Sequence, residues 1–255
     1  PSRNRSQGIV SFDANTGEKE WGSPTATDVL APPVVYDGIV YTAANDGNYY
    51  GFNATDGTET YYTDISASVA GAPTISNNTF LVPTSGGRLF AFDLYLNKEW
   101  DTSVSADPLS AVTVKDGTIF VGTPYDDGPI NALDMDGNEI WSTQSSWGID
   151  GAPTYAGGTV YFVSSDYPED AYAVGYNPDT GDEVFNSSIG NFSQSPPTVF
   201  NGVLYAGSNN GNLNAIDLGH SKSSSGSRNR LHTLGHVGDV YESDSTGTAT
   251  PTPGE

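Results

Sequence analysis

The stretch Pro33-Val-Val-Tyr-Asp-Gly-Ile-Val-Tyr41 recurs along the chain and decides the fold. Its later copies begin at Pro73, Val112, Pro153 and Pro197, at spacings of 40, 39, 41 and 44 residues. A large aromatic residue keeps step with them, at Trp21, Tyr61, Trp100, Trp141 and Phe185, with the same four spacings. Because two separate markers share every spacing, the sequence is an internal repeat of about 40 residues.

Each period contains the signals of four short strands. An alternating run ends at Asp-Gly or Asn-Gly, as at Asp37-Gly38, which is the strongest short-range hairpin signal. The third and fourth runs are separated by a turn with glycine, at Gly17, Gly57, Gly137 and Gly181. One four-stranded antiparallel sheet in each repeat is typical of a propeller blade, whereas a β-sandwich does not repeat its turns at a fixed spacing. The sequence therefore predicts an all-β propeller.

The turn and the aromatic residue together resemble a known motif. Ser11-Phe-Asp-Ala-Asn-Thr-Gly-Glu-Lys-Glu-Trp21 is similar to the tryptophan-docking motif of propellers of the pyrroloquinoline-quinone (PQQ) type, and the similarity covers residues 8–218. Segments 51–61 and 175–185 repeat the motif with Trp replaced, and 91–100 and 132–141 are one residue shorter. The resemblance implies that each large aromatic lies between neighbouring blades. It leaves the function open, because the family contains quinone dehydrogenases, assembly lipoproteins and surface proteins.

The charge is strongly acidic and unevenly placed. The 255 residues carry 31 acidic and 9 basic side chains, a net charge of −22, and residues 7–219 contain 27 of the acids with only Lys19, Arg88, Lys98 and Lys115. Such a charge repels nucleic acids and anionic lipid headgroups. It also fits a protein adapted to high salt, where self-repulsion is screened; the simpler alternative is an ordinary acidic protein.

Few residues point to catalysis or to a cofactor. The chain has no cysteine, which excludes the vicinal disulfide that the resemblance associates with PQQ enzymes, and Arg88 is an isolated cation that we expect on an exposed hairpin. Asp134-Met-Asp-Gly-Asn-Glu139 resembles half of a calcium loop but fits the repeated turn better. The histidines His220, His232 and His236 all lie beyond the repeat. We therefore expect no catalytic, cofactor-binding or metal-binding residues, with PQQ and Ca²⁺ bound only under the enzyme alternative.

The best candidates for ligand contact are variable loops. Two turns between second and third strands depart from the plain form, and the only Trp outside the repeat position lies in a connection between blades. These residues are Tyr125, Asp126, Asp127, Trp147, Tyr167, Glu169 and Asp170. Loops on the face of a rigid scaffold are where binding residues concentrate. The alternative is sequence drift between blades.

We expect a disordered head over 1–7, the propeller over 8–219, an irregular segment over 220–244 and a disordered Thr/Pro-rich tail over 245–255. The outer strand of the fifth blade should lie within 219–230, although its aromatic is missing. Six blades follow if residues 231–243 pair with the N-terminal strands and close the ring. Five follow if the tail is disordered and the N-terminal strands complete the fifth blade instead.

The sequence favours a non-catalytic binding or scaffold module, secreted or at the cell surface of a high-salt organism. It would bind a protein or a small molecule on a loop face, act as a monomer, and neither span a membrane nor bind nucleic acid. The alternatives are a PQQ-dependent dehydrogenase or its remnant, and a sensor or assembly propeller.

Overall fold

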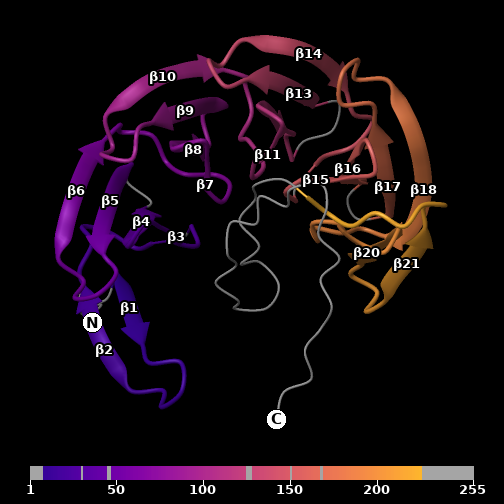
Figure 1. The fold of residues 1–255 in the computed structure, drawn as a ribbon. Coiled ribbons are helices and arrows are strands. Elements are labelled where there is room, and N and C mark those ends of the chain that lie inside the picture. The colour runs from indigo at the N-terminus through magenta and orange to yellow at the C-terminus, as the bar shows by residue number, and fades with distance from the viewer. Residues whose placement is uncertain are drawn as a thin grey trace.

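The fold is a curved row of antiparallel sheets (Figure 1). The structure is a computed structural model and describes residues 8–29, 31–44, 47–124, 128–149, 151–166 and 169–225. Four sheets have four strands each: β3 (Val34–Tyr36), β4 (Ile39–Ala43), β5 (Asn48–Asn53) and β6 (Glu59–Asp64); β7 (Thr74–Ser76), β8 (Thr79–Pro83), β9 (Arg88–Phe92) and β10 (Lys98–Ser103); β11 (Thr113–Lys115), β12 (Thr118–Val121), β13 (Pro129–Asp134) and β14 (Glu139–Gln144); and β15 (Thr154–Ala156), β16 (Thr159–Ser165), β17 (Asp170–Tyr176) and β18 (Glu183–Asn191). The predicted all-β fold with four-stranded antiparallel sheets is confirmed.

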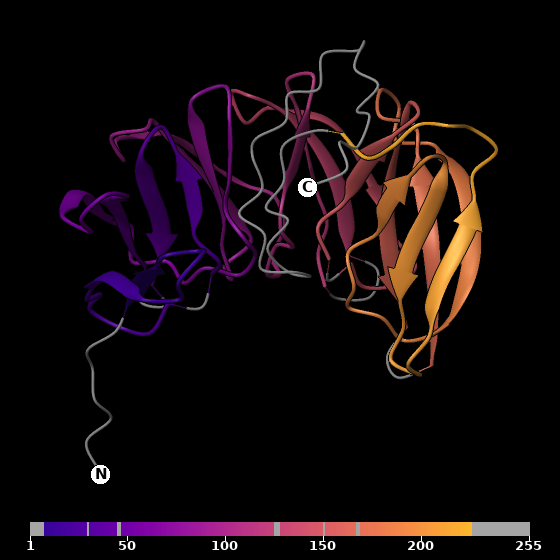
Figure 2. The same cartoon turned by 60° about the horizontal axis from the view of Figure 1, so that its bottom comes forward.

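Two incomplete sheets lie at the ends of the row. β1 (Ile9–Phe12) pairs only with β2 (Lys19–Ser23), and β19 (Thr198–Phe200), β20 (Val203–Gly207) and β21 (Leu213–Asp217) form a three-stranded sheet. Figure 2 shows these two sheets on opposite sides of the molecule, and no strand of the described residues joins them. The predicted closure by residues 231–243 lies outside the described residues.

Tight two-residue hairpins join the first two strands of every sheet except β1–β2. The two central residues of the first hairpin, Asp37 and Gly38, both have positive φ, at 46° and 74°, and Asn201 and Gly202 repeat this at 48° and 75°. Two successive positive φ angles define a type I′ turn, whose twist matches that of paired strands. In each four-stranded sheet the short first strand lies at the inner side and the fourth strand at the outer side (Figure 1).

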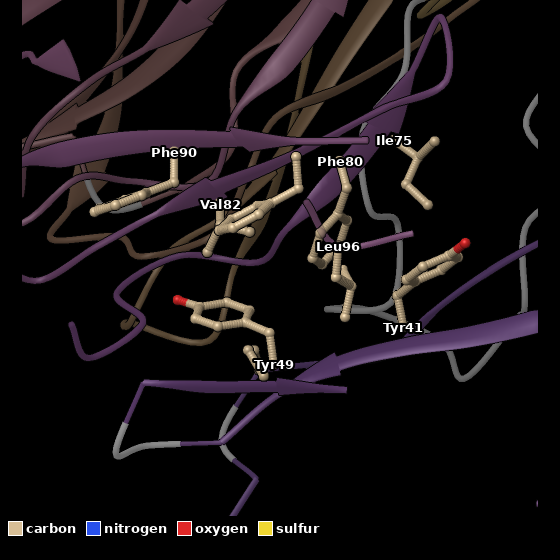
Figure 3. Close-up of a cluster of buried hydrophobic side chains, with 10 residues drawn as sticks. Tyr41, Tyr49, Ile75, Phe80, Val82, Phe90 and Leu96 are labelled. Atoms are coloured by element: carbon tan, nitrogen blue, oxygen red, sulfur yellow. The ribbon is translucent and has the colours of Figure 1, made fainter. Parts of the chain in front are cut away.

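The hydrophobic core lies between successive sheets rather than inside one. Tyr41 and Tyr49 of one sheet meet Phe80 and Phe92 of the next, with ring centroids 5.4 Å apart for Tyr41–Phe80 and 5.8 Å for Tyr49–Phe92 (Figure 3). These four side chains are almost completely buried. Aromatic pairs at this separation add to the stabilisation from area burial, so each sheet is held mainly by its neighbours.

The chain turns inward after β21, contrary to our expectation of an outer strand. Gly202 N donates to Lys222 O (2.7 Å), Ser224 N to Val199 O (2.8 Å) and Ser225 N to Tyr155 O (2.8 Å). Residues 219–225 thus run back to the inner strands β19 and β15, and the expected outer strand is wrong for this part of the segment. The serine hydroxyls replace the ladder bonds, because Ser224 Oγ also accepts from Val199 N at 2.7 Å.

Candidate functional site

One face of the molecule is formed by the turns between second and third strands together with the connections between sheets. The connections hydrogen-bond to the glycines of these turns: Ile65 N donates to Gly47 O (3.1 Å), Val104 N to Gly87 O (2.9 Å) and Ser145 N to Gly128 O (3.1 Å). A Cβ on Gly87 would lie only 2.1 Å from Ser105 O, so this close approach requires glycine. We call this surface the loop face.

Trp147 lies on the loop face where the chain enters the fourth four-stranded sheet. It is half-buried, its carbonyl accepts a hydrogen bond from Ser164 Oγ (3.2 Å), and the next residue, Gly148, forms a bridge with Ser165. Ser164 is fixed in turn by Ser145, with 3.0 Å between the two hydroxyl oxygens. The indole is therefore carried on a hydrogen-bonded connection and not on a free loop.

The turn between β16 and β17 places two exposed acids on the same face. Glu169 N donates to Asp166 O at 2.7 Å, and Glu169 O accepts from Phe192 N at 3.1 Å, so the backbone is held from both sides. Asp170 begins β17 opposite Asn191. Since Trp147 O accepts from Ser164 Oγ and the next residue, Gly148, bridges Ser165, the structure brings Trp147, Glu169 and Asp170 to one end of one sheet. The other four candidates, Tyr125, Asp126, Asp127 and Tyr167, lie outside the described residues.

Arg88 lies on a hairpin, half-exposed, and its charge is already paired. Its Nε donates to Asp101 Oδ2 at 2.8 Å, its Nη2 contacts the same oxygen, and Lys98 Nζ lies 2.9 Å from Asp101 Oδ1. The Lys98 and Arg88 hydrogen bonds lower the pKa of the Asp101 carboxyl. Asp101 lies on the outer strand β10. The Arg88 side chain is therefore directed to the outer edge of its sheet and not to the inner strands.

The calcium-like segment is a turn whose carboxylate has internal partners. Asp134 accepts from Asn138 Nδ2 (2.9 Å), Asn138 N (2.8 Å) and Asp136 N (2.9 Å). These bonds, that of the Asn138 side chain first, lower the pKa of Asp134. No group of three or more metal-ligating side chains occurs among the residues that the structure describes. His220 packs over Gly157; His232 and His236 lie outside the described residues.

The repeated aromatics dock on the turn of the following sheet. The indole Nε1 donates to a turn carbonyl in three cases: Trp21 to Ala54 (3.0 Å), Trp100 to Met135 (2.9 Å) and Trp141 to Pro178 (2.7 Å). The rings cover Gly57, Gly137 and Gly181, which have no room for a Cβ. The smaller Tyr61 and Phe185 instead meet another ring edge-on, Tyr95 at 5.5 Å and Tyr161 at 5.7 Å.

Sequence reasoning missed two buried polar side chains at the turn between β12 and β13. Thr123 Oγ1 and Asn131 Nδ2 are buried and have no hydrogen-bond partner among the described residues. Asn131 lies opposite Val121, the last residue of β12, and Thr123 follows two residues later in the turn. The sequence did contain a signal: Asn131 is polar, whereas the corresponding residues of the other four-stranded sheets are Tyr50, Phe90 and Val174.

Repeated four-stranded sheets joined by docked aromatics define a β-propeller of the PQQ-like repeat class. The chain belongs to the family whose model is described as outer membrane protein assembly factor BamB, which matches residues 2–112 and 96–218. Similar proteins named outer membrane protein assembly factor BamB include one from Nitrosomonas eutropha, 29% identical over 155 residues (54% of this chain and 37% of the relative). Another, from Yersinia pestis, is 26% identical over 232 residues, 82% of this chain and 49% of the relative. The chain thus spans about half the length of these relatives or less.

Solved structures share the fold. BamB from Moraxella catarrhalis has a TM-score of 0.70 at 18% identity, with 88% of this chain and 71% of that chain covered. Quinohemoprotein alcohol dehydrogenase from Comamonas testosteroni has a TM-score of 0.62 at 17% identity, covering 79% and 43%. Assembly proteins and oxidoreductases therefore share this architecture, and it does not by itself separate binding from catalysis. No helix among the described residues is long and apolar enough to cross a membrane.

Proposed function

We propose that the protein is a non-catalytic propeller that binds a partner protein on its loop face, at the cell surface or in the cell envelope. The observation that carries the proposal is the grouping of a half-exposed Trp147 with the exposed Glu169 and Asp170 on a hydrogen-bonded backbone. A rigid aromatic side chain beside charged groups is typical of binding hot spots. The family membership supports the same role, since its model is named for outer membrane protein assembly.

The acidic surroundings favour a basic partner segment. Residues 7–219 carry 27 acidic and 4 basic side chains, so the field around the loop face attracts cations and repels nucleic acid. A partner that places Lys or Arg against Glu169 and Asp170 and an apolar side chain against Trp147 would match both features. We propose a monomer without a bound cofactor.

A quinone-dependent dehydrogenase is the weaker candidate. A tricarboxylate cofactor needs cations, and Arg88, the one arginine of the described residues, is paired with Asp101 on the outer strand β10. Saturable micromolar binding of PQQ in the presence of Ca²⁺ would contradict our proposal.

The loop-face proposal is tested with a urea-unfolded outer-membrane β-barrel protein as probe, diluted into buffer containing the chain. We expect the Trp147→Ala substitution to weaken binding by at least about tenfold, as truncation of a hot-spot aromatic does. Phe200→Ala is the matched control, because Phe200 is also an exposed aromatic but lies beside the hairpin at the opposite end of its sheet. Equal loss in the two variants, or no loss in Trp147→Ala, would refute the assignment.

Two finer parts of the proposal concern salt and ring closure. We propose adaptation to high salt, so the melting temperature should rise from dilute to molar KCl and exceed the rise in sucrose of matched water activity. We also propose that residues 231–243 close a six-bladed ring with β1 and β2. Cutting after residue 225, which keeps the bonds of Ser224 and Ser225, should then abolish cooperative melting, whereas a five-bladed ring would melt unchanged.

A further inference from the structure

The outer strand β18 is the longest strand of the described residues and carries almost no charge. It has nine residues, against six for each of the outer strands β6, β10 and β14. Glu183 is its single charged side chain, and residues 184–216 contain no Asp, Glu, Lys, Arg or His. Because residues 7–219 carry 27 acidic side chains, this uncharged stretch is a local exception in an acidic protein.

The outer strands of the other three four-stranded sheets are shorter and carry more of the charge. Their charged residues are Glu59 and Asp64 on β6, Lys98, Glu99 and Asp101 on β10, and Glu139 on β14. Charged side chains and short length protect an edge strand from pairing with another chain. Of the four outer strands, β18 is therefore the least protected.

The outward side of β18 is open over residues 184–188, which we call the β18 edge. β18 is the last strand of its sheet and pairs only with β17 (Figure 1). Val184, 56% exposed, and Asn186 are exposed, and no hydrogen bond between described residues joins another element to the backbone of 184–187. The edge stops at Ile189, whose carbonyl accepts from Asn214 Nδ2 (2.9 Å). Every second residue of an edge strand directs its N–H and C=O outward, so the β18 edge offers free donors and acceptors.

The C-terminal end of β18 leads to the acids of the loop face. Asn191, its last residue, lies opposite Asp170, and Phe192 N donates to Glu169 O at 3.1 Å. A strand added antiparallel on the β18 edge would have its N-terminal end here. It would lie two strand spacings, about 10 Å, from β17, a distance that a Lys or Arg side chain and an exposed acidic side chain span together. The two acids thus favour a basic residue at that end.

We infer that the β18 edge binds an extended segment of a partner protein as a fifth, antiparallel strand of the sheet. The segment is uncharged and rich in β-branched residues alongside 184–188, and it begins with Lys or Arg near Glu169 and Asp170. Backbone hydrogen bonds hold a segment added in this way, and its alternate side chains give specificity.

A second copy of the chain is a poor occupant. Two β18 strands paired antiparallel along their length would bring Glu183 of each copy to the Asp170 end of the other, acid against acid. The inference rests on the proposed function, since it states how the partner is held, but the β18 edge is a different surface from the loop face.

The test is a titration of the ¹⁵N-labelled chain with the peptide acetyl-Lys-Arg-Thr-Val-Thr-Ile-Thr-Val-amide. We expect an affinity of about 1 mM or tighter, as suits a short segment that becomes ordered on binding. Hydrogen exchange should slow at the outward amides of 184–188 and stay unchanged on β14. Only one edge of an added strand pairs, so N-methylation of one alternate set of peptide residues should abolish binding, and methylation of the other set should preserve it.

Lysines on the strand locate the binding site. Val184→Lys combined with Asn186→Lys should weaken binding at least about tenfold, because lysine on an edge strand opposes pairing. Ile140→Lys combined with Ser142→Lys is the matched control, since these exposed residues hold the same two positions of the repeat on β14 and the net charge changes equally. The control should change the affinity less than about twofold.

Four outcomes would overturn the inference: unchanged exchange over 184–188 at millimolar peptide, equal losses in the two double-lysine variants, equal effects of the two methylated peptides, or a dimer of the free chain that the lysines on β18 dissociate. Glu169→Gln combined with Asp170→Asn should weaken binding about threefold; no loss would refute the antiparallel orientation. Failure of the loop-face proposal is measured separately, with Trp147→Ala and the β-barrel probe, and Trp147→Ala should leave the binding of the peptide unchanged.

Discussion

The pair formed by Tyr61 and Leu96 offers a sharp test of how the sheets are joined. At the turn after β9, Leu96 stands where the other turns have glycine, and it adopts a φ of 61° that leucine normally avoids. Its side chain is only 3% exposed and packs in the same cluster as Tyr61, which stands where three other sheets have tryptophan. A smaller aromatic and a larger turn residue therefore fill one space together.

The expected energies follow from this packing. Leu96→Gly removes a buried leucine side chain, worth about 2–5 kcal/mol, and relieves left-handed strain of about 1–2 kcal/mol, so a net loss of about 0–4 kcal/mol is expected. Tyr61→Trp alone overpacks the site at a cost of about 1–3 kcal/mol. In the double variant the larger ring fills the space left by Leu96, so the two losses should cancel by at least about 1 kcal/mol.

The measurement is a double-mutant cycle by urea unfolding at constant KCl, because salt changes the repulsion of the acidic body. Val184→Ala, an exposed position on the outer strand β18, serves as the control second site for each single variant and should be additive. Losses for Tyr61→Trp and Leu96→Gly that add within about 0.5 kcal/mol would refute the idea that the two residues compensate each other.

Two further predictions concern docking and pH. Gly181→Ala should lower the free energy of unfolding by about 2–4 kcal/mol, and Gly38→Ala by about 1 kcal/mol. Both substitutions strain a positive φ, but only the methyl group at 181 would clash with an indole, that of Trp141. Equal losses measured by urea unfolding would contradict this. Burial, together with repulsion from nearby anionic groups, raises the pKa of Tyr41 to about 12. Because the unfolded chain ionises first, near the usual value of about 10, the free energy of unfolding should fall as pH rises from about 10 to about 12. Tyr41→Phe should reduce this fall despite losing the hydrogen bond to Leu94 O (2.8 Å), and an unchanged alkaline slope would count against the assignment.

The repeated sheets were predictable because every local signal agreed. Asp37-Gly38 forms the type I′ turn that its residue types favour, and the alternating residues on either side form β3 and β4. Because the same signals recur at a nearly constant spacing, they predicted strands in the other sheets too, including the three strands β19–β21. The local propensities and the repeat period were together consistent with only one arrangement of strands.

The inward course of residues 219–225 was not predictable from the period. The repeat required an outer strand there, but Ser221–Ser225 contains no apolar residue to pack on a neighbouring sheet. The hydroxyl of Ser224 instead bonds Val199 N, and Thr154 Oγ1 donates to it at 2.8 Å. Single hydroxyl hydrogen bonds between residues so far apart in the sequence produce no periodic pattern in it.

The candidate site was predictable only as a set of loops. That Trp147 and Glu169 share one end of a sheet depends on the bridge between Gly148 and Ser165, a backbone contact with no side-chain signature. Leu96 was missed for a related reason. Glycine is expected at a positive φ, and only the packing around Leu96 explains why leucine is kept there.

The sign of the salt dependence follows from where the few cations lie. Among the described residues the ion pairs are Arg88–Asp101, Lys98–Asp101 and Lys115–Asp116, all with at least one exposed partner. Surface pairs of this kind contribute about 0–1 kcal/mol each, so screening them removes little. The same screening acts on the mutual repulsion of 27 acidic side chains in residues 7–219. The uncharged contacts between sheets, such as that of Tyr41 with Phe80, are not weakened by salt. Salt strengthens the burial of apolar surface, so it makes these contacts more stabilising. Repulsion therefore dominates the response to salt, and added KCl should stabilise the fold.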